Sequence, residues 1–380
     1  VGYFTTARVD YTDDVAVKTK THFVSRWRLE KKDPAAAVSE PKEPIVFWLD
    51  KNIPEKYRQS VADGVLEWNK AFEKAGFKNA LVVKQQTPQD DFDTMDARHA
   101  SVRWFTGSDV GFAIGPSHKD PRTGEILDAD IGFSDVFARG ARRLVTEDLG
   151  RPLLVDPHAD VIADPLRAHK GFLACNYGSF AAQELHFAMD LLEARGIDMD
   201  SPEADKLAQA YVKDVMMHEV GHTLGLRHNF RASMAYSLKQ LQDPAFTRAN
   251  GVTTSVMDYT PFNISPRGEV QGEFVMSTLG PYDYWAIEYG YRQFDEKEEA
   301  AALAKIASRS TEPTLAFSTD EDAGYGNRYV GIDPDVNRFD LGSDPLAYYK
   351  RQMQLSRELW DRLQDMKLED GASYERLTRS

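Results

Sequence analysis

One stretch of eleven residues limits the possible folds of this chain more than any other feature. Residues 218–228 read HEVGHTLGLRH. On a helix, His218 and His222 lie one turn apart and project side by side, so their imidazoles can share one metal ion. His228 lies beyond the helix, and the chain must turn sharply to bring it back to the other two. Gly225 can supply that turn, because glycine adopts positive φ angles without steric cost.

This ligand set is typical of a catalytic zinc ion. Catalytic zinc takes three protein ligands and keeps an open position, whereas a structural site closes with a fourth protein ligand. Glu219, next to His218, is placed to take a proton from the water that the metal activates. The alternative, two surface histidines that happen to share a helix face, accounts for neither His228 nor the turn glycine. We therefore predict one zinc ion held by His218, His222 and His228, with Glu219 as the catalytic base.

A second motif follows downstream, where residues 255–259 read SVMDY. HExxHxxGxxH followed by a methionine-containing turn is the metzincin signature, and the chain resembles that group of zinc peptidases. By this resemblance Met257 forms an apolar floor beneath the zinc ligands. Tyr259 matches a tyrosine that reaches the zinc or the oxyanion in the astacin and serralysin branches, so we expect it to assist catalysis. The alternatives are a core methionine and a packed tyrosine with an idle hydroxyl.

The resemblance extends beyond these motifs. The segments EPIVFWLD, DPRTGEILDADI, HEVGHTLGLRHNF and GPYDYWAIEYGY are together similar to a family of large bacterial zinc-dependent metalloproteases, usually exported. The similarity implies a zinc endopeptidase with a polypeptide substrate, located in the periplasm, at the cell surface or outside the cell. Asn229, after the third histidine, departs from the Glu, Pro, Ser or Asp of the familiar branches, so their substrate rules do not transfer.

The order of elements predicts an α+β fold. Short apolar or alternating runs predict strands at 1–10, 45–49, 80–84 and 100–105 and a hairpin at 110–133. A helix over 54–76 joins two of these strands, which are then parallel. The metzincin resemblance implies a twisted, mixed five-stranded sheet over this helix and a second one, 202–226, that carries the zinc ligands. The substrate cleft is expected along the hairpin edge.

Three regions are expected along the chain. Residues 1–43 read as a strand and linker segment, the end of a larger upstream region. Residues 44–269 form the metzincin-like catalytic domain, with an insertion at 136–200 that contains a helix near 180–195. Residues 270–380 form a helical C-terminal region with helices at 282–291 and 345–368. The chain opens with Val1 and has no visible signal peptide, so we expect its natural N-terminus to lie elsewhere.

Composition excludes several partners. The formal net charge is −14 and no dense Lys/Arg cluster occurs, so nucleic acid is not expected to bind. No apolar run is long enough for a transmembrane helix. Cys175 is the only cysteine, which rules out an intramolecular disulfide and is typical of a small buried hydrophobe. We expect a monomer.

Some residues suggest sites that we do not favour. A calcium-loop pattern places Asp333, Asp335, Asn337 and Asp340 together, but Arg338 replaces the turn glycine, so a solvated acidic turn is preferred. Asp128 and Asp130 are expected to be exposed charges on the hairpin. The remaining histidines show no metal-ligand spacing and are read as ordinary surface or core residues: His22, His99, His118, His158, His169 and His186.

Two other functions remain open. One is a metzincin-like module that holds zinc and recognises a polypeptide or glycan with little catalysis, and the other is a zinc amidase that acts on non-protein amides. Glu219 favours an enzyme over a binding module, because a purely structural zinc site needs no base.

Overall fold

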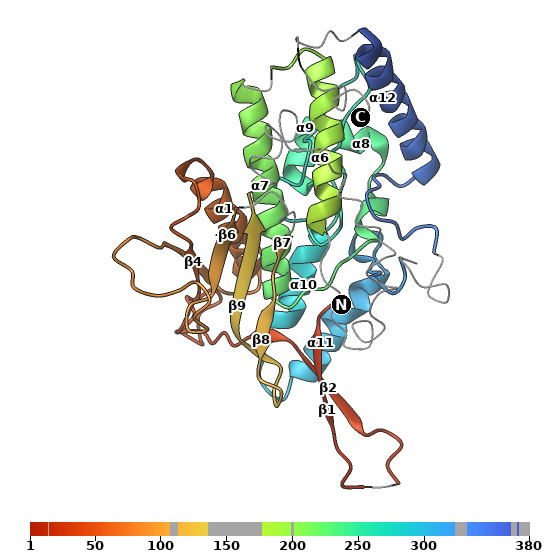
Figure 1. Ribbon diagram of the computed structural model, residues 1–380. Coiled ribbons are helices and arrows are strands. Elements are labelled where there is room, and N and C mark those ends of the chain that lie inside the picture. The colour runs from red at the N-terminus through yellow and green to blue at the C-terminus, as the bar shows by residue number, and fades with distance from the viewer. Residues whose placement is uncertain are drawn as a thin grey trace.

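A mixed sheet beside long helices forms the core of the molecule (Figure 1). The computed structural model describes residues 1–13, 15–106, 113–135, 177–198, 201–323, 333–365 and 371. The strands of the main sheet are β3 (Arg26–Trp27), β4 (Ile45–Leu49), β5 (Leu81–Gln85), β6 (Ser101–Phe105), β7 (Ala113–Ile114), β8 (Ser117–Lys119) and β9 (Glu125–Ser134).

The main path of the sheet has the order β3-β9-β6-β4-β5, and its neighbouring strands are parallel. Strands β7 and β8 pair antiparallel with β9 and form the predicted hairpin edge. Within the described residues, the α+β class and the mixed sheet are therefore confirmed, but the expected number of five strands is wrong, because the described sheet has seven.

Two of the helices cross closely behind the sheet. They are α1 (Glu55–Glu67) and α7 (Pro202–Thr223). A Cβ on Gly64 would lie 2.6 Å from the Cβ of Met216, so only glycine allows this approach. The single helix predicted over 54–76 is wrong in one respect, because α1 stops at Trp68 and α2 (Asn69–Lys74) follows. The interruption falls where the buried Trp68 indole donates a hydrogen bond to the Met217 carbonyl oxygen, 3.0 Å away.

The remaining α-helices of the described segments lie later in the chain than α1 and α2. They are α6 (Tyr177–Ala194), α8 (Leu238–Leu241), α9 (Pro244–Asn250), α10 (Pro281–Tyr291), α11 (Glu299–Ala307) and α12 (Pro345–Asp365). The predicted helices at 180–195, 282–291 and 345–368 are confirmed as far as the chain is described. Helix α11 was not predicted, because it buries little of its surface and its sequence is mostly alanine. Cys175, His158, His169 and the rest of the insertion at 136–176 lie outside the described residues.

The N-terminal segment is joined to the rest of the fold. Strands β1 (Thr5–Val9) and β2 (Lys20–Val24) form a hairpin that projects from the body (Figure 1). Just before it, the Phe4 amide donates to the Gly225 carbonyl oxygen at 2.8 Å, and the Arg227 amide donates to the Gly2 carbonyl oxygen at 2.8 Å. The segment thus runs directly beside the turn that follows α7.

One expectation about the hairpin is wrong. Asp128 is only 2% exposed, and its carboxylate lies 3.3 Å from the Nδ1 atom of His118. Asp130 is half-buried and accepts a 2.7 Å hydrogen bond from the Ser101 hydroxyl. The reason is that both residues lie on the interior strand β9 and contact its neighbours, Asp128 contacting His118 on β8 and Asp130 contacting Ser101 on β6. The helices of the described segments include none that is both long and apolar enough for a membrane span.

Candidate metal centre

The three motif histidines converge on one point. His218 and His222 extend from α7, and His228 returns from the loop beyond it. The Nε2 atom of His222 lies 3.1 Å from the Nε2 atoms of both His218 and His228, and all three residues are buried. Tetrahedral zinc with Zn–N bonds of about 2.0–2.1 Å separates its nitrogen ligands by about 3.3 Å. The spacing of these nitrogens therefore fits a zinc ion. No other group of metal ligands is found in the described part of the chain.

The opposite ring nitrogens are all occupied. The Nδ1 atom of His218 lies 2.7 Å from the Val256 carbonyl oxygen, and that of His222 lies 2.9 Å from the Leu226 carbonyl oxygen. The Nδ1 atom of His228 lies 3.0 Å from a carboxylate oxygen of Asp320. These oxygens only accept hydrogen bonds, so each Nδ1 carries the hydrogen and each Nε2 keeps its lone pair.

Burial favours the neutral form of the two imidazoles on α7, those of His218 and His222. Burial, with the neighbouring imidazoles, lowers the pKa of His218 well below its usual value and that of His222 to about 3. The neutral ring is the form that binds a metal. The chemistry of the donor set therefore matches the ion that the motif predicts.

Two features of the structure require a glycine at the turn after α7. Gly225 has a φ angle of +96°, and a Cβ there would lie 2.0 Å from the Ser25 carbonyl oxygen. The positive φ was expected from the motif. The close approach to Ser25 was not expected, because it depends on how the N-terminal segment packs against the turn.

Met257 lies against α7 between the two helical ligands. Its side chain is fully buried, and its sulfur would lie 2.2 Å from a Cβ placed on Gly221. Gly221 is the fourth residue of the HEVGH run, so the close fit of this methionine explains why a residue without a side chain stands there. The motif reasoning used Gly225 alone and missed Gly221.

A buried carboxylate holds the SVMDY turn in place. Asp283, near the start of α10, accepts hydrogen bonds from the Ser255 hydroxyl at 2.6 Å and from the Val256 amide at 3.0 Å. Burial raises the pKa of Asp283 to about 7, although these bonds oppose the shift. Because Val256 offers its carbonyl to His218, Asp283 fixes the acceptor of a predicted zinc ligand. Sequence reasoning missed this residue, although it lies in the GPYDYW tract.

Tyr259 and Glu219 both lie at the triad. The Tyr259 ring is buried, 4.7 Å from the His228 ring and 5.6 Å from the His218 ring, measured between centroids. Glu219 follows His218 on α7 and is fully buried. Burial raises the pKa of Glu219 to about 8, and a nearby cation would lower it again. The structure therefore brings all the sequence-predicted site residues into one region.

Asp320 is the main residue that the sequence did not reveal. It is separated from His228 by 92 residues, yet both its carboxylate oxygens lie within 3.1 Å of the His228 ring nitrogen. Arg338 donates to the same carboxylate at 3.3 Å, and Arg227 lies 3.8 Å away. Burial alone would raise the pKa of Asp320. The hydrogen bond to His228 and the two guanidinium groups have the larger, opposite effect, so the pKa lies well below its usual range. The carboxylate is therefore charged.

Two residues after the third histidine bring Asp320 into reach. The Asn229 side-chain amide donates to the Ala316 carbonyl oxygen at 3.0 Å and accepts from the Ser318 amide at 3.2 Å. The Phe230 amide donates to the Ser318 carbonyl oxygen at 2.8 Å. Asn229, which departs from the familiar metzincin branches, thus attaches the segment that carries Asp320.

A cleft of about 400 Å³ opens beside the triad. Its walls come from the N-terminal segment, the β7–β8 edge and the loop segments at 227–228 and 320–321, and His222 and His228 line it. A Cβ on Gly115, between β7 and β8, would lie 2.6 Å from the Glu219 carbonyl oxygen, so the edge lies directly on α7. The hairpin edge therefore borders the cleft, as expected.

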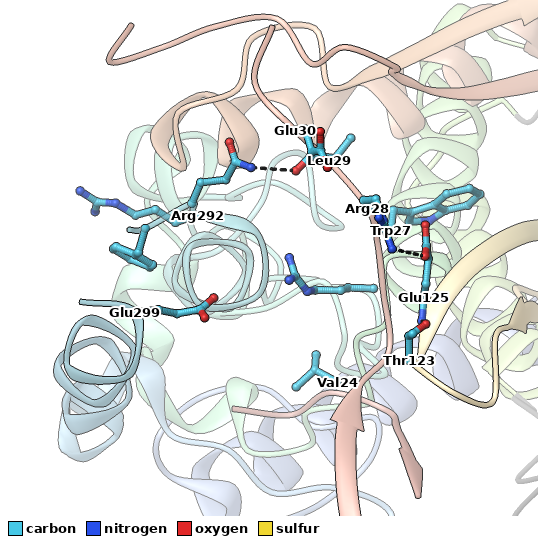
Figure 2. A pocket seen from close by; sticks show the side chains of 12 residues that line it. Val24, Trp27, Arg28, Leu29, Glu30, Thr123, Glu125, Arg292 and Glu299 are labelled. Carbon is cyan, nitrogen blue, oxygen red and sulfur yellow. Dashed lines mark hydrogen bonds and ion pairs between the residues drawn. The ribbon is translucent and has the colours of Figure 1, made fainter. Parts of the chain in front are cut away.

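A separate hollow of about 350 Å³ lies between residues 24–30 and 292–299 (Figure 2). It contains acidic and basic side chains, and some of them pair with each other, as Arg28 does with Glu125 at 2.9 Å. Trp27, on its wall, donates from its indole nitrogen to the Thr223 carbonyl oxygen at 2.8 Å. Its lining includes no histidine, so nothing marks it as a metal site.

The other sites considered from sequence do not assemble. Asp333 and Asp335 pair with Arg231 at 2.9 and 3.2 Å rather than pointing toward a shared ion. Asp340 is 1% exposed, so the solvated acidic turn is wrong at that position. The three other histidines with described side chains have unrelated neighbours: Thr5 for His22, Phe92 for His99 and Asp128 for His118.

Comparisons with known proteins agree with this geometry. Residues 200–380 match a family model described as Met-zincin. Residues 1–32 match a model described as a domain of unknown function (DUF5117). A search of curated proteins and a search of solved structures found no match. The Met-zincin match includes α7, the three histidines, the SVMDY turn and Asp320. Over residues 200–380, the chain is therefore similar to the Met-zincin family.

Proposed function

We propose that this protein is a zinc-dependent endopeptidase in which His218, His222 and His228 hold the metal. The observation that carries the proposal is the convergence of the three Nε2 atoms. The Nδ1 atom of each ring is already hydrogen-bonded to an oxygen. Three ligands leave a tetrahedral ion one open position, which is the catalytic arrangement. The adjoining cleft has room for a chain segment.

The residues around the triad have separate roles in this proposal. When bound, Zn²⁺ polarises a carbonyl oxygen and makes water a nucleophile near neutral pH. Glu219 takes the proton of the attacking water and gives it to the leaving amine. The Tyr259 hydroxyl stabilises the developing oxyanion, and Met257 supports the ligands as the Met-turn methionine. The edge strand β8 binds the substrate backbone as an added strand.

Substituting Glu219 by Gln tests the proposal. We expect peptide hydrolysis to fall by roughly 10²–10⁴-fold, because the proton acceptor is lost while the shape is kept. Zinc content and the thermal midpoint should stay close to wild type. Glu203→Gln is the matched control, since Glu203 is an exposed glutamate on the same helix. Near-full hydrolysis by Glu219→Gln would show that the assigned base is wrong.

The choice of substrate separates this function from its alternatives. Unfolded casein and a peptide library are incubated with the protein before and after chelation. Cleavage that chelation abolishes and zinc restores supports the endopeptidase. Bound zinc without cleavage favours a recognition module, and hydrolysis confined to non-protein amides favours an amidase.

The proposal includes an exported, monomeric protein. The location follows the similarity to exported bacterial metalloproteases, so it is the periplasm, the cell surface or the medium. Residues 1–43, 44–269 and 270–380 are proposed as its three regions. A structural calcium ion is not part of the proposal.

A further inference from the structure

One cation in the cleft has no opposite charge beside it. Lys119 is the last residue of β8 and lines the cleft with His222 and His228. Within the described segments, its ammonium group makes no ion pair or hydrogen bond, and its close neighbour is the ring of Phe4, 4.9 Å from the nitrogen to the centroid. Partial burial lowers the pKa of Lys119. A partly desolvated cation gains from a carboxylate more than an exposed one does.

The other charges of the cleft already have partners. Arg227 pairs with Glu321 at 2.6 Å. Asp320 is engaged by His228 and by Arg338. Among the described residues of this lining, Lys119 is therefore the charge that remains available for a ligand.

The direction of β8 places Lys119 on the substrate side. Both Ser117 and Lys119 line the cleft, although the pairing of β8 with β9 shifts register between His118 and Lys119. His118, between them, turns to Asp128 instead. The β8 edge is the strand along which an extended peptide would pair.

Phe4 connects this lysine to the zinc ligands. Its ring lies 6.0 Å from the His222 ring and 4.9 Å from the Lys119 nitrogen. An extended peptide advances about 3.3 Å per residue, so Lys119 is reached within about three residues of a bond cleaved at the triad. The ring also offers an apolar surface for the methylene groups of a bound side chain.

We propose that Lys119 and Phe4 form a subsite for an aspartate or glutamate side chain within three residues of the scissile bond. The inference rests on the proposed endopeptidase function and specifies its substrate class. Neither the motif nor the family description assigns a side-chain preference to this chain.

A peptide series tests the subsite. Each position within three residues of a cleavable bond carries Asp, Asn or Lys in turn. At one position, wild-type protein should cleave the Asp peptide about 10-fold faster in kcat/KM than the Asn peptide. Lys119→Met should abolish that preference, and Lys119→Glu should reverse it in favour of Lys. Lys84→Met is the matched control, because Lys84 also lies over an aromatic ring, that of Trp48, but on β5.

Binding separates failure of the subsite from failure of the enzyme assignment. The same peptides, now carrying a fluorescent label, are titrated into zinc-loaded Glu219→Gln protein, and binding is followed by fluorescence anisotropy. Tighter binding of the Asp peptide that disappears with Lys119→Met supports the subsite, even if no peptide is ever cleaved. Equal binding of Asp and Asn peptides, or no binding, overturns it, whereas absent cleavage by the wild type counts against the endopeptidase.

Discussion

At the scale of single residues, the three proposed zinc ligands are not equivalent. His218 and His222 each donate to a backbone carbonyl oxygen, whereas His228 donates to the charged carboxylate of Asp320. A carboxylate partner makes the imidazole a stronger electron donor and fixes its ring orientation. Asp320 is a positioning residue, since it acts on the metal through His228.

Removing this carboxylate should weaken zinc binding. For Asp320→Asn we expect the zinc Kd to rise by about 10–100-fold, because such partners typically contribute that much to affinity. Competition with a chromophoric chelator measures it without relying on catalysis. Glu321→Gln is the control, since Glu321 is the next residue, pairs with Arg227 and is not bonded to His228. Unchanged affinity in Asp320→Asn would mean that the ring is oriented by other contacts.

At the scale of elements, one charged pair joins two helices that are distant in sequence. Helices α6 and α12 pack against each other (Figure 1). Arg195, just after α6, donates to both carboxylate oxygens of Glu358 on α12, at 2.9 and 2.8 Å. Both side chains are less than a fifth exposed, so this pair is less screened than a surface pair.

The contribution of this pair should depend on pH. The hydrogen bond from Arg195 lowers the pKa of Glu358 from its usual 4.5. A carboxyl with a lowered folded-state pKa stabilises the fold above its unfolded-state pKa, and the stabilisation disappears as pH falls through the folded-state value. A double-mutant cycle with Arg195→Met and Glu358→Gln should therefore give a coupling of about 1–2 kcal/mol at pH 7 and less below pH 4.5. Urea unfolding at several pH values measures it, and a coupling that grows in acid contradicts the assignment.

At the scale of the whole molecule, the metal centre joins distant parts of the chain. The N-terminal segment contacts the turn after α7, and the segments that carry Asp320 and Arg338 meet at His228. The SVMDY turn is held between α7 and Asp283 on α10. An ion at the triad would therefore stabilise contacts in both halves of the protein.

Chelation should lower the stability of the entire protein. A ligand that binds only the native state stabilises it by about 4 kcal/mol at a thousandfold excess over its Kd. We expect the thermal midpoint to fall by several degrees on zinc removal, to recover on zinc addition, and to respond less in His228→Ala. Scanning calorimetry with and without chelator measures this. An identical midpoint in both conditions would exclude a role for the ion in the fold.

Much of the centre follows from local sequence, because local geometry is sufficient for it. The one-turn spacing of His218 and His222, the glutamate beside them and the turn at Gly225 all arise within eleven residues. The strands and long helices follow from apolar periodicity in the same way. The helix break at Trp68 and the burial of Asp128 do not follow from the local sequence. Each depends on a contact with another part of the chain.

The sequence by itself was enough to predict a zinc ion, its three ligands and the class of chemistry that they would support. Only the tertiary structure decided which groups orient those ligands and what the cleft offers a substrate. Asp320, Asp283 and the pairing of Lys119 with Phe4 have no motif of their own. Each joins segments tens to more than a hundred residues apart, and such contacts are set by the packing of the whole chain rather than by helix or turn geometry.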